Sequence, residues 1–175
     1  MTHRIAHILL PLLLAALAVT GCNTSGCLEN QSALPRAGFY ASRSGQTISI
    51  DSIAVWGVGS PGDSLLAYGR ASSVLMPLRS TSDEATFCFH YLQKSVSDAR
   101  LNDTLKISYS STPKFISEEC GAMYFHTVTA VTCTTHLIDS VAIKDADVTN
   151  FDKETLRIYF RTAEPEEDSS SSTEQ

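Results

Sequence analysis

The sequence predicts an all-β protein, a single antiparallel β-sandwich that is immunoglobulin-like in the broad sense and is preceded by a lipoprotein signal peptide. Short runs rich in Thr, Ser, Val, Ile and aromatic residues recur between turn signals along the chain. After Cys22, no stretch keeps a helical period of about 3.6 residues over three turns. Short strands at this spacing are typical of sandwiches and barrels, whereas alternating strands and helices would indicate a parallel sheet.

The expected strands begin shortly after Pro35. In the second of them, Ile48 and Ile50 share one face, and Ile53 and Val55 then follow with the opposite parity. A β-bulge at Asp51-Ser52 would keep all four side chains inward. The expected strands span 38–42, 46–58, 63–70, 72–78, 84–92, 103–111, 113–119, 122–137, 140–148 and 154–162.

The last of these strands has the cleanest alternation. Leu156, Ile158 and Phe160 share one face, and the residues between them are Arg157 and Tyr159. This pattern is typical of a strand with one face in the core. We expect a single β-sandwich domain over residues 36–162, which is an ordinary domain length.

Residues 1–21 have the features of a bacterial lipoprotein signal peptide. Arg4 supplies a short basic region, and every residue from Ile8 to Val19 is apolar. This run is too short to span a bilayer, which needs about 20 apolar residues. Val19-Thr20-Gly21-Cys22 resembles the bacterial lipobox, in which the cysteine is lipidated and becomes the first residue of the mature chain. An ordinary secretory signal with a chance cysteine is the weaker alternative, because Cys22 directly follows the small residue that ends the run.

Lipidation of Cys22 would hold the mature chain at a membrane surface without crossing it, with residues 22–35 as a lipidated tether. Asn23 stands where an aspartate is associated with inner-membrane retention, so we expect the outer membrane. The acidic cluster that often marks surface export of lipoproteins is missing after Cys22. This favours a periplasm-facing position, with the cell surface as the alternative.

Charge is unevenly distributed along the chain. Of the 175 residues, 13 are Lys or Arg and 19 are Asp or Glu. Five of the acidic residues lie in the final segment 163–175, which leaves 12 basic and 14 acidic residues between Cys22 and Thr162. This nearly neutral domain has no basic stripe, so nucleic acid is not an expected partner. The Ser/Glu-rich tail, 163–175, has no large apolar residue and is expected to be disordered.

The cysteine count indicates disulfides. With Cys22 lipidated, four cysteines remain, namely Cys27, Cys88, Cys120 and Cys133. An even number in an exported protein suggests disulfide bonds, although four cysteines allow three pairings. A zinc site is the rival interpretation, but none of these cysteines has the C-x₂₋₄-C spacing of such sites. No metal site and no cofactor are expected.

Several short motifs occur in an order that resembles a known family. The chain is similar to a family of small Bacteroidetes lipoproteins of unknown function over most of its length from Cys22 to Phe160. The family has no established activity, so the resemblance implies a compartment and a fold but no chemistry. The motifs are Cys27-Leu28, Trp56-Gly57-Val58-Gly59, Asp63-Ser64-Leu65, Leu75-Met76-Pro77-Leu78, Asp103-Thr104-Leu105 leading to Tyr109, Glu119-Cys120-Gly121, Ile138-Asp139-Ser140 and Leu156-Arg157-Ile158-Tyr159-Phe160.

The resemblance implies a disulfide between Cys27 and Cys120, because the matching cysteines recur together in that family. Such a bridge would staple the tether to the domain and stabilise it by about 3–5 kcal/mol if it is unstrained. Cys88 and Cys133 then form the second expected pair. The alternative for this second pair is two buried free thiols.

Two sequence motifs suggest ligand sites but have simpler explanations. Gly57–Gly62 has the G-x-G-x-x-G spacing of a dinucleotide site, yet Pro61 and the strand-like residues after it leave no helix to hold a pyrophosphate. Asp145–Asp152 has oxygen ligands at spacings that suit calcium. Asn150 and Leu156, however, stand where an EF-hand places Gly and Glu. We expect a glycine-rich hairpin and an Asx turn respectively.

The remaining candidates are histidines and one tryptophan. His126 and His136 are ten residues apart in an expected strand, about 33 Å if it is straight, so they cannot share a metal. His90 is the third histidine that could serve as a base. Trp56, beside the glycine-rich loop, could stack on a sugar, although a lone tryptophan in a sandwich is more often a core residue. No catalytic residue is expected.

Together these observations predict a non-enzymatic lipoprotein of the outer membrane. Its expected role is a scaffold or binding module that engages another envelope protein, such as an outer-membrane β-barrel, through a sheet edge or loops. The alternative is a glycan-binding lipoprotein that uses Trp56, and an envelope enzyme ranks third. The oligomeric state is left open by the sequence.

Overall fold

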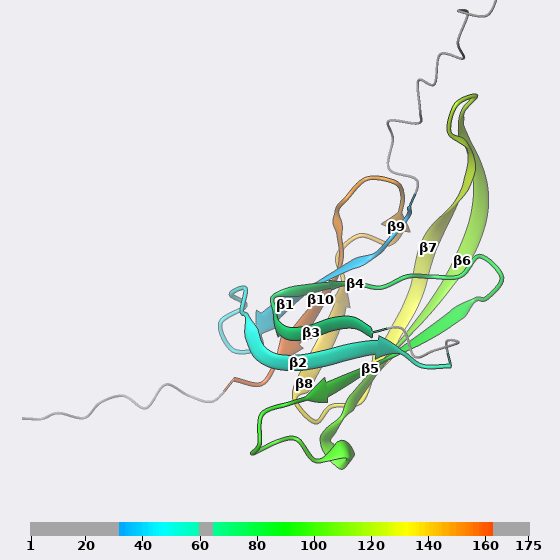
Figure 1. Cartoon of the computed structure of the whole chain (residues 1–175). Coiled ribbons are helices and arrows are strands. Elements are labelled where there is room, and N and C mark those ends of the chain that lie inside the picture. The colour runs from blue at the N-terminus through cyan, green and yellow to red at the C-terminus, as the bar shows by residue number, and fades with distance from the viewer. Residues whose placement is uncertain (1–31, 60–64, 163–175) are drawn as a thin grey trace, which may run out of the picture.

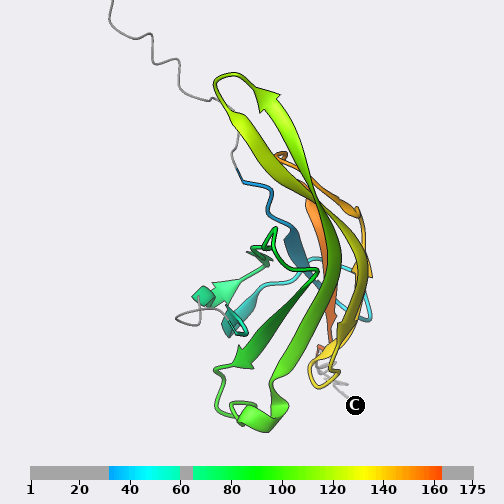
Figure 2. The same ribbon diagram turned by 90° about the vertical axis from the view of Figure 1, so that its right-hand side faces the viewer.

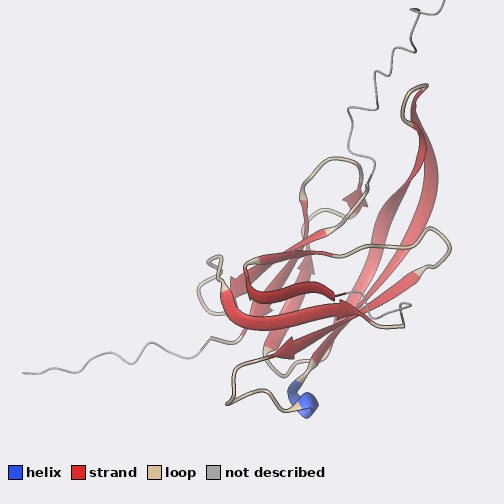
Figure 3. Ribbon diagram, viewed as in Figure 1, coloured by secondary structure: helices blue, strands red, loops and turns tan. Residues whose placement is uncertain are grey.

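A computed structural model describes residues 32–59 and 65–162, and these residues form two β-sheets packed as a sandwich (Figure 1). Strands dominate the described chain, and its only helical element is the short 3₁₀ turn η1 (Ala99–Leu101) (Figure 3). The predicted all-β sandwich is therefore confirmed. Residues 1–31, 60–64 and 163–175 lie outside the described residues, and with them the predicted signal peptide, Cys22, most of the tether and the acidic tail.

The smaller sheet contains four strands. Its order is β4 (Ser73–Leu75), β1 (Arg36–Ala41), β10 (Glu154–Phe160) and β8 (Ile138–Ile143). β1 and β10 run parallel, whereas the other two neighbouring pairs are antiparallel. The prediction of an antiparallel sandwich therefore holds for every described strand pair except β1–β10. Parallel neighbours need a long crossover connection, and here nearly the whole domain lies between them in sequence.

The larger sheet contains six strands, all in antiparallel pairs. Its consecutive strands are mostly neighbours, as expected for hairpin connections. The order is β3 (Leu65–Ala71), β2 (Ile50–Gly57), β5 (Glu84–Tyr91), β6 (Asp103–Ser117), β7 (Gly121–Cys133) and β9 (Asp147–Val148).

An aromatic cluster joins the two sheets in the core. Phe39 of β1 and Phe160 of β10 belong to the smaller sheet, and Phe89 of β5 belongs to the larger one. The ring centroids of Phe39 lie 5.2 Å from Phe160 and 6.4 Å from Phe89, in edge-to-face arrangements. All three rings are buried. Edge-to-face contacts of this kind stabilise a core beyond the area that they bury.

The predicted bulge near Asp51-Ser52 is confirmed. The register between β2 and β3 shifts between Ile50 and Ile53, as an extra residue in one strand requires. Ile53 and Val55 are fully buried, and Ile50 packs half-buried against the same core. The predicted alternation of β10 is also confirmed, because Leu156, Ile158 and Phe160 are its buried apolar residues.

The two strands predicted at 103–111 and 113–119 form one long strand, β6. Pro113, where the second of them was expected to begin, lies inside the strand opposite Tyr124 of β7. The described pairing between β5 and β6 ends at Ser108, so Pro113 has β7 on one side only. A proline lacks an N–H group and is tolerated at such an unpaired edge. The β6–β7 hairpin consequently projects beyond the sandwich (Figures 1 and 2).

Other strand limits also differ from the prediction. The expected strand 122–137 ends at Cys133, because the Asp103 carboxylate binds the backbone N–H groups of His136, Leu137 and Ile138 and turns the chain there. The expected strand 140–148 is divided into β8 and β9. Within the described ranges, no helix is long and apolar enough to cross a membrane.

Candidate functional site

Trp56 lies on the outer face of the larger sheet. Its neighbour Val55 points into the core and is fully buried, so Trp56 points the opposite way and is half-buried. The indole ring lies 6.2 Å from the imidazole of His90, at an interplanar angle of 54°. Trp56 is therefore not a core residue, and its ring is partly available to a ligand.

A row of side chains crosses the sheet beside Trp56. Tyr68, Ala54 and His90 occupy directly opposed positions on β3, β2 and β5. Tyr68 is 71% exposed, and His90 Nδ1 lies 2.7 Å from Oδ1 of Asn102. Because opposed residues share a face, Trp56, Tyr68 and His90 form an aromatic patch, a term that we keep for these three residues.

The predicted disulfide between Cys88 and Cys133 is wrong, because both cysteines are free thiols. Cys88 on β5 lies opposite Thr104, and Cys133 on β7 lies opposite Leu105, so β6 separates the two cysteines. Two strand spacings amount to about 9–10 Å, which exceeds the Cα separation of a disulfide. Thr104 and Leu105 also point to opposite faces, and so do the two thiols. Burial is the main cause of the raised pKa of both thiols, and the negative charge of Asp103 raises it further.

Cys120 lies at the turn of the projecting hairpin. Its backbone N–H group donates to Oγ of Ser117, and its side chain is half-buried. Unlike Cys88 and Cys133, Cys120 is not a free thiol. Cys27, its predicted partner, lies outside the described residues.

The Asp145–Asp152 loop contains the predicted Asx turn. The backbone N–H group of Asp147 donates to Oδ1 of Asp145 at 3.0 Å. The other carboxylate oxygen of Asp145 lies 2.7 Å from Nζ of Lys153, so the charge of Asp145 is already paired within the protein. Hydrogen bonds from Lys153 and from the Asp147 backbone lower the pKa of Asp145. In the described part of the chain, no three His, Cys, Asp or Glu side chains gather closely enough to hold a metal ion.

His126 is buried in the projecting hairpin, where Nδ1 lies 2.9 Å from Oγ of Ser111. Burial lowers the pKa of His126. A surface hollow of this hairpin is lined by both His126 and Asp147. However, His126 lies opposite Val148 and Asp147 lies opposite Thr127, so their side chains point to opposite faces. Asp147 therefore does not form a catalytic pair with the His126 imidazole.

Asp103 is the centre of a hydrogen-bond network that the sequence reasoning did not identify. Its fully buried carboxylate accepts hydrogen bonds from the Tyr91 hydroxyl at 2.7 Å and the Thr134 hydroxyl at 2.9 Å. The backbone N–H groups of residues 136, 137 and 138 also donate to it, at 2.8, 2.8 and 2.9 Å. Burial opposes the charge of Asp103, but these hydrogen bonds outweigh it and lower its pKa.

The His136 side chain lies 3.3 Å from the Asp103 carboxylate, beyond the end of β7. His126 lies within β7, so the two histidines share no site.

A second polar cluster covers the outer face of the smaller sheet. Glu154 accepts hydrogen bonds from Tyr40 at 2.6 Å and Arg157 at 2.8 Å, and its carboxylate lies 3.2 Å from Nζ of Lys144. Partial burial opposes ionisation, but these three partners outweigh it and lower the pKa of Glu154 to about 2. A side chain at Gly38 would meet this carboxylate, so the absence of a Cβ there makes room for the cluster.

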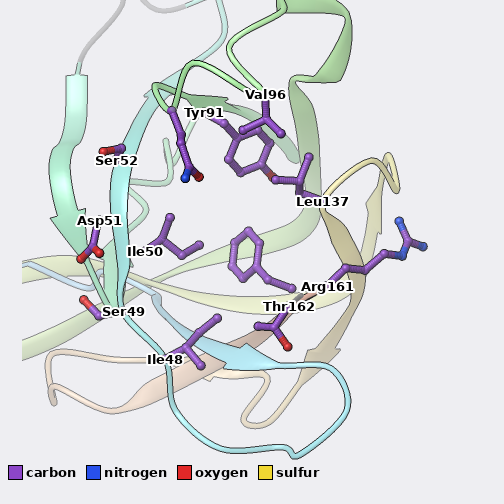
Figure 4. A pocket seen from close by; sticks show the side chains of 12 residues that line it. Ile48, Ser49, Ile50, Asp51, Ser52, Tyr91, Val96, Leu137, Arg161 and Thr162 are labelled. Atoms are coloured by element: carbon purple, nitrogen blue, oxygen red, sulfur yellow. The ribbon is translucent and has the colours of Figure 1, made fainter. Parts of the chain in front are cut away.

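One end of the sandwich contains a cavity of about 310 Å³, which we call the end cavity. It lies where β5 and β10 end and where β2 begins (Figure 4). The sequence reasoning missed it because its walls come from four segments that are far apart in the chain. Its lining comprises Ile48, Ser49, Ile50, Asp51, Ser52, Tyr91, Gln93, Val96, Leu137, Phe160, Arg161 and Thr162. Trp56 is not part of this lining.

The larger sheet also has a free edge at β3. Among the described residues, β3 pairs with β2 on one side and with no strand on the other. Leu65 is 58% exposed and Tyr68 71% exposed, and Arg70 is the only charged residue of this strand. Natural edge strands are usually protected by charges, prolines, β-bulges or extreme shortness. Besides Arg70, the described protection of β3 is its irregular register with β2, and the strand has no proline and no second charge.

Comparisons with known proteins match one family. Residues 52–160 match the model of a family of unknown function, DUF6452. The matched range runs from the second residue after the start of β2 to the last residue of β10 and includes Trp56, Asp103 and Cys120. A search of the curated proteins and a search of the solved structures return no match.

Proposed function

The chain belongs to DUF6452, a family of unknown function, and we propose that it is a lipid-anchored, non-enzymatic binding module of the outer membrane. The observation that carries the binding role is the free and poorly protected edge of β3. An extended segment of another envelope protein, such as an outer-membrane β-barrel, would add to this edge as a further strand. Main-chain hydrogen bonds would then supply the affinity, and Leu65 and Tyr68 would supply contacts specific to the partner.

The lipid anchor is supported by the sequence before the described domain. Residues 1–21 have the composition of a lipoprotein signal, and Cys22 directly follows them. Ser32, where the described chain begins, is ten residues from Cys22, so the tether reaches about 35 Å at most. A tether this short keeps the domain close to the membrane surface. Asn23 after the cysteine favours the outer membrane, with the periplasmic face as the first choice.

A disulfide between Cys27 and Cys120 would shorten the tether further. Its support is that Cys120 is the one described cysteine that is not a free thiol. Both remaining described cysteines are separated by β6 and cannot pair with each other. Such a bridge would fasten the turn of the projecting hairpin five residues from the lipidated Cys22.

The anchor is tested by metabolic labelling with palmitate. Cys22→Ala is expected to abolish labelling and to release the protein from membranes. Cys27→Ala is the matched control and is expected to keep both the label and the membrane association. Undiminished labelling of the Cys22→Ala protein would refute the anchor.

The binding role is tested with a photo-crosslinking residue placed at Tyr68. It is expected to capture a heat-modifiable β-barrel protein from intact envelopes, and the capture should be lost when Leu65 is replaced by lysine. The same crosslinker at Ile143, which lies on β8 of the other sheet, is the matched control and should capture no such protein. Equal capture from both positions, or no reproducible partner, would refute binding at this edge.

A glycan-binding role is the second candidate, and the aromatic patch favours it. Stacking on the exposed faces of Trp56 and Tyr68 is a suitable way to hold a sugar ring, and the half-buried indole is positioned by His90. Binding to an array of envelope glycans should be reduced at least tenfold by Trp56→Ala. Phe151→Ala is the control, because it removes an aromatic ring that is 75% exposed and lies outside the aromatic patch. A binding pattern that Trp56→Ala leaves unchanged would remove this candidate.

A further inference from the structure

We propose that the end cavity binds an uncharged aliphatic chain. The cavity is open to solvent at one end of the sandwich and is separate from both the β3 edge and the aromatic patch. Six of its twelve lining residues are apolar. Ile48 and Ile50 point into it from one wall, and Val96 and Leu137 face them from the other (Figure 4). The rings of Tyr91 and Phe160, both buried core residues, complete the lining.

The charged groups at the rim are already paired with other parts of the protein. The carboxylate of Asp51 lies 2.6 Å from Nε of Arg70 and points away from the cavity (Figure 4). The guanidinium of Arg161 donates to the carbonyl oxygens of Thr135 and His136, and its Nε lies 3.3 Å from Asp139. Arg161 also extends away from the cavity (Figure 4).

The remaining polar residues of the lining are uncharged. They are Ser49, Ser52, Gln93 and Thr162. A charged ligand group would lose its hydration inside the cavity without gaining an ion pair, which is strongly unfavourable. An apolar chain loses nothing of this kind and gains burial of about 25 cal/mol per Å². The ligand is therefore uncharged in the part that enters the cavity.

The Asp103 network holds two parts of the cavity wall in place. Tyr91 donates its hydroxyl group to Asp103, so only the ring of Tyr91 is presented to the cavity. The backbone N–H group of Leu137 also donates to Asp103. Preformed sites of this kind lose little conformational freedom when a ligand binds. The wall is thus ordered before a ligand arrives.

The volume limits the size of the ligand. A water molecule occupies about 30 Å³ in the liquid, and we take a similar volume for each methylene group of a ligand. A cavity of 310 Å³ therefore holds an aliphatic chain of about ten carbons. Segment 163–175 contains no large apolar side chain, so its sequence offers no apolar group to occupy the cavity. The occupant must come from outside this chain's C-terminal segment.

The test uses two fluorescent probes that differ in charge. 1-Naphthylamine is uncharged at neutral pH and is about as large as a ten-carbon chain, and 1-naphthylamine-5-sulfonate has the same ring system with a sulfonate. Titration of the purified protein is expected to give saturable binding of the uncharged probe with one site, and at least tenfold weaker binding of the sulfonate. Equal affinity for both probes, or no saturable binding of the uncharged one, would overturn the proposal.

Two substitutions that fill the cavity from opposite walls locate the probe. Val96→Trp and Ile48→Trp are each expected to weaken binding at least tenfold, and Ile143→Trp, outside the cavity, should leave it unchanged. Far-ultraviolet circular dichroism identifies any variant that does not fold, and the other filling variant then decides the result. Unchanged binding in a folded filling variant would contradict the assignment.

Competition distinguishes the source of the chain. Displacement of the probe by 1-decanol alone would indicate a small free molecule. Displacement by both 1-decanol and decanoyl lysophosphatidylcholine would indicate that the cavity accepts one chain of a membrane lipid. Failure of both compounds to displace the bound probe would overturn the aliphatic class of ligand.

Discussion

Replacing Asp103 by asparagine is expected to lower the free energy of unfolding by about 3–5 kcal/mol. Oδ1 of Asp103 accepts hydrogen bonds from the Thr134 hydroxyl and the His136 backbone N–H group. Oδ2 accepts from Tyr91 and from the backbone N–H groups of Leu137 and Ile138. An asparagine keeps one acceptor oxygen only, so it must present an NH₂ group to one of these two sets of donors.

The smaller loss occurs when the NH₂ group replaces Oδ1. The Thr134 hydroxyl can rotate and accept, but the His136 N–H group cannot, and a buried donor without an acceptor costs about 1–3 kcal/mol. The three donors that still face the oxygen lose the charge of their acceptor. Hydrogen bonds to charged groups contribute about 1.5–3 kcal/mol, against about 0.5–1.5 kcal/mol for neutral ones. A lower desolvation cost of the neutral amide offsets part of this loss.

The assay is urea unfolding of the purified protein, followed by circular dichroism. Asp51→Asn is the matched control because it removes an ion pair whose side chains are 69% and 73% exposed. Exposed pairs of this kind contribute about 0–1 kcal/mol, so this control should change stability little. A loss below about 1 kcal/mol for Asp103→Asn would refute the assignment of Asp103 as the organiser of this end of the sandwich.

The same network predicts a pH dependence. The pKa of Asp103 is lower in the folded protein than its ordinary value, which is about 3.9 in an unfolded chain. Its ionisation therefore contributes stability above about pH 4, and that contribution is lost as the pH falls toward the folded-state pKa. Unfolding midpoints between pH 7 and pH 2 should fall less steeply in Asp103→Asn than in the unsubstituted protein. An equally steep fall of the unfolding midpoint with falling pH in both proteins would contradict this prediction.

Three further predictions concern packing and thiol chemistry. Gly38→Ala should destabilise the protein by about 1–3 kcal/mol in urea unfolding, because the new methyl group meets the Glu154 carboxylate; an unchanged midpoint would contradict this. Thr155→Val should leave stability unchanged or raise it by about 1 kcal/mol in the same assay, since the buried Thr155 hydroxyl has no hydrogen-bond partner among the described residues; a clear loss would indicate an unrecognised partner. Cys88 and Cys133 should both be modified by a thiol reagent only after unfolding in urea, because burial raises the pKa of each thiol; prompt modification of the folded protein would refute this.

Local patterns were sufficient to predict most of the strands. The alternation of Leu156, Ile158 and Phe160 predicted β10 and its buried face, and both are confirmed. The parity change at Asp51-Ser52 predicted a bulge because a strand can keep its apolar residues inward only by inserting a residue. These features depend on side-chain periodicity within a few residues, which a sequence contains directly.

The errors arose where a distant neighbour decides the outcome. Pro113 would end a strand paired on both sides, but it lies beyond the end of the β5–β6 pairing and is tolerated. The Cys88–Cys133 pair was predicted by counting, whereas strand order places β6 between the two thiols. The end of β7 depends on Asp103, which is more than 30 residues away in sequence from its backbone partners.

The sequence by itself determined the all-β class and the approximate position of most strands, because these follow from hydrophobic periodicity along the chain. Only the tertiary structure decided the parallel pairing of β1 with β10, the two free thiols, the free edge of β3 and the end cavity. Each of these features depends on which strands become neighbours in space. Strand order is set by the packing of the whole core, and no local pattern encodes it.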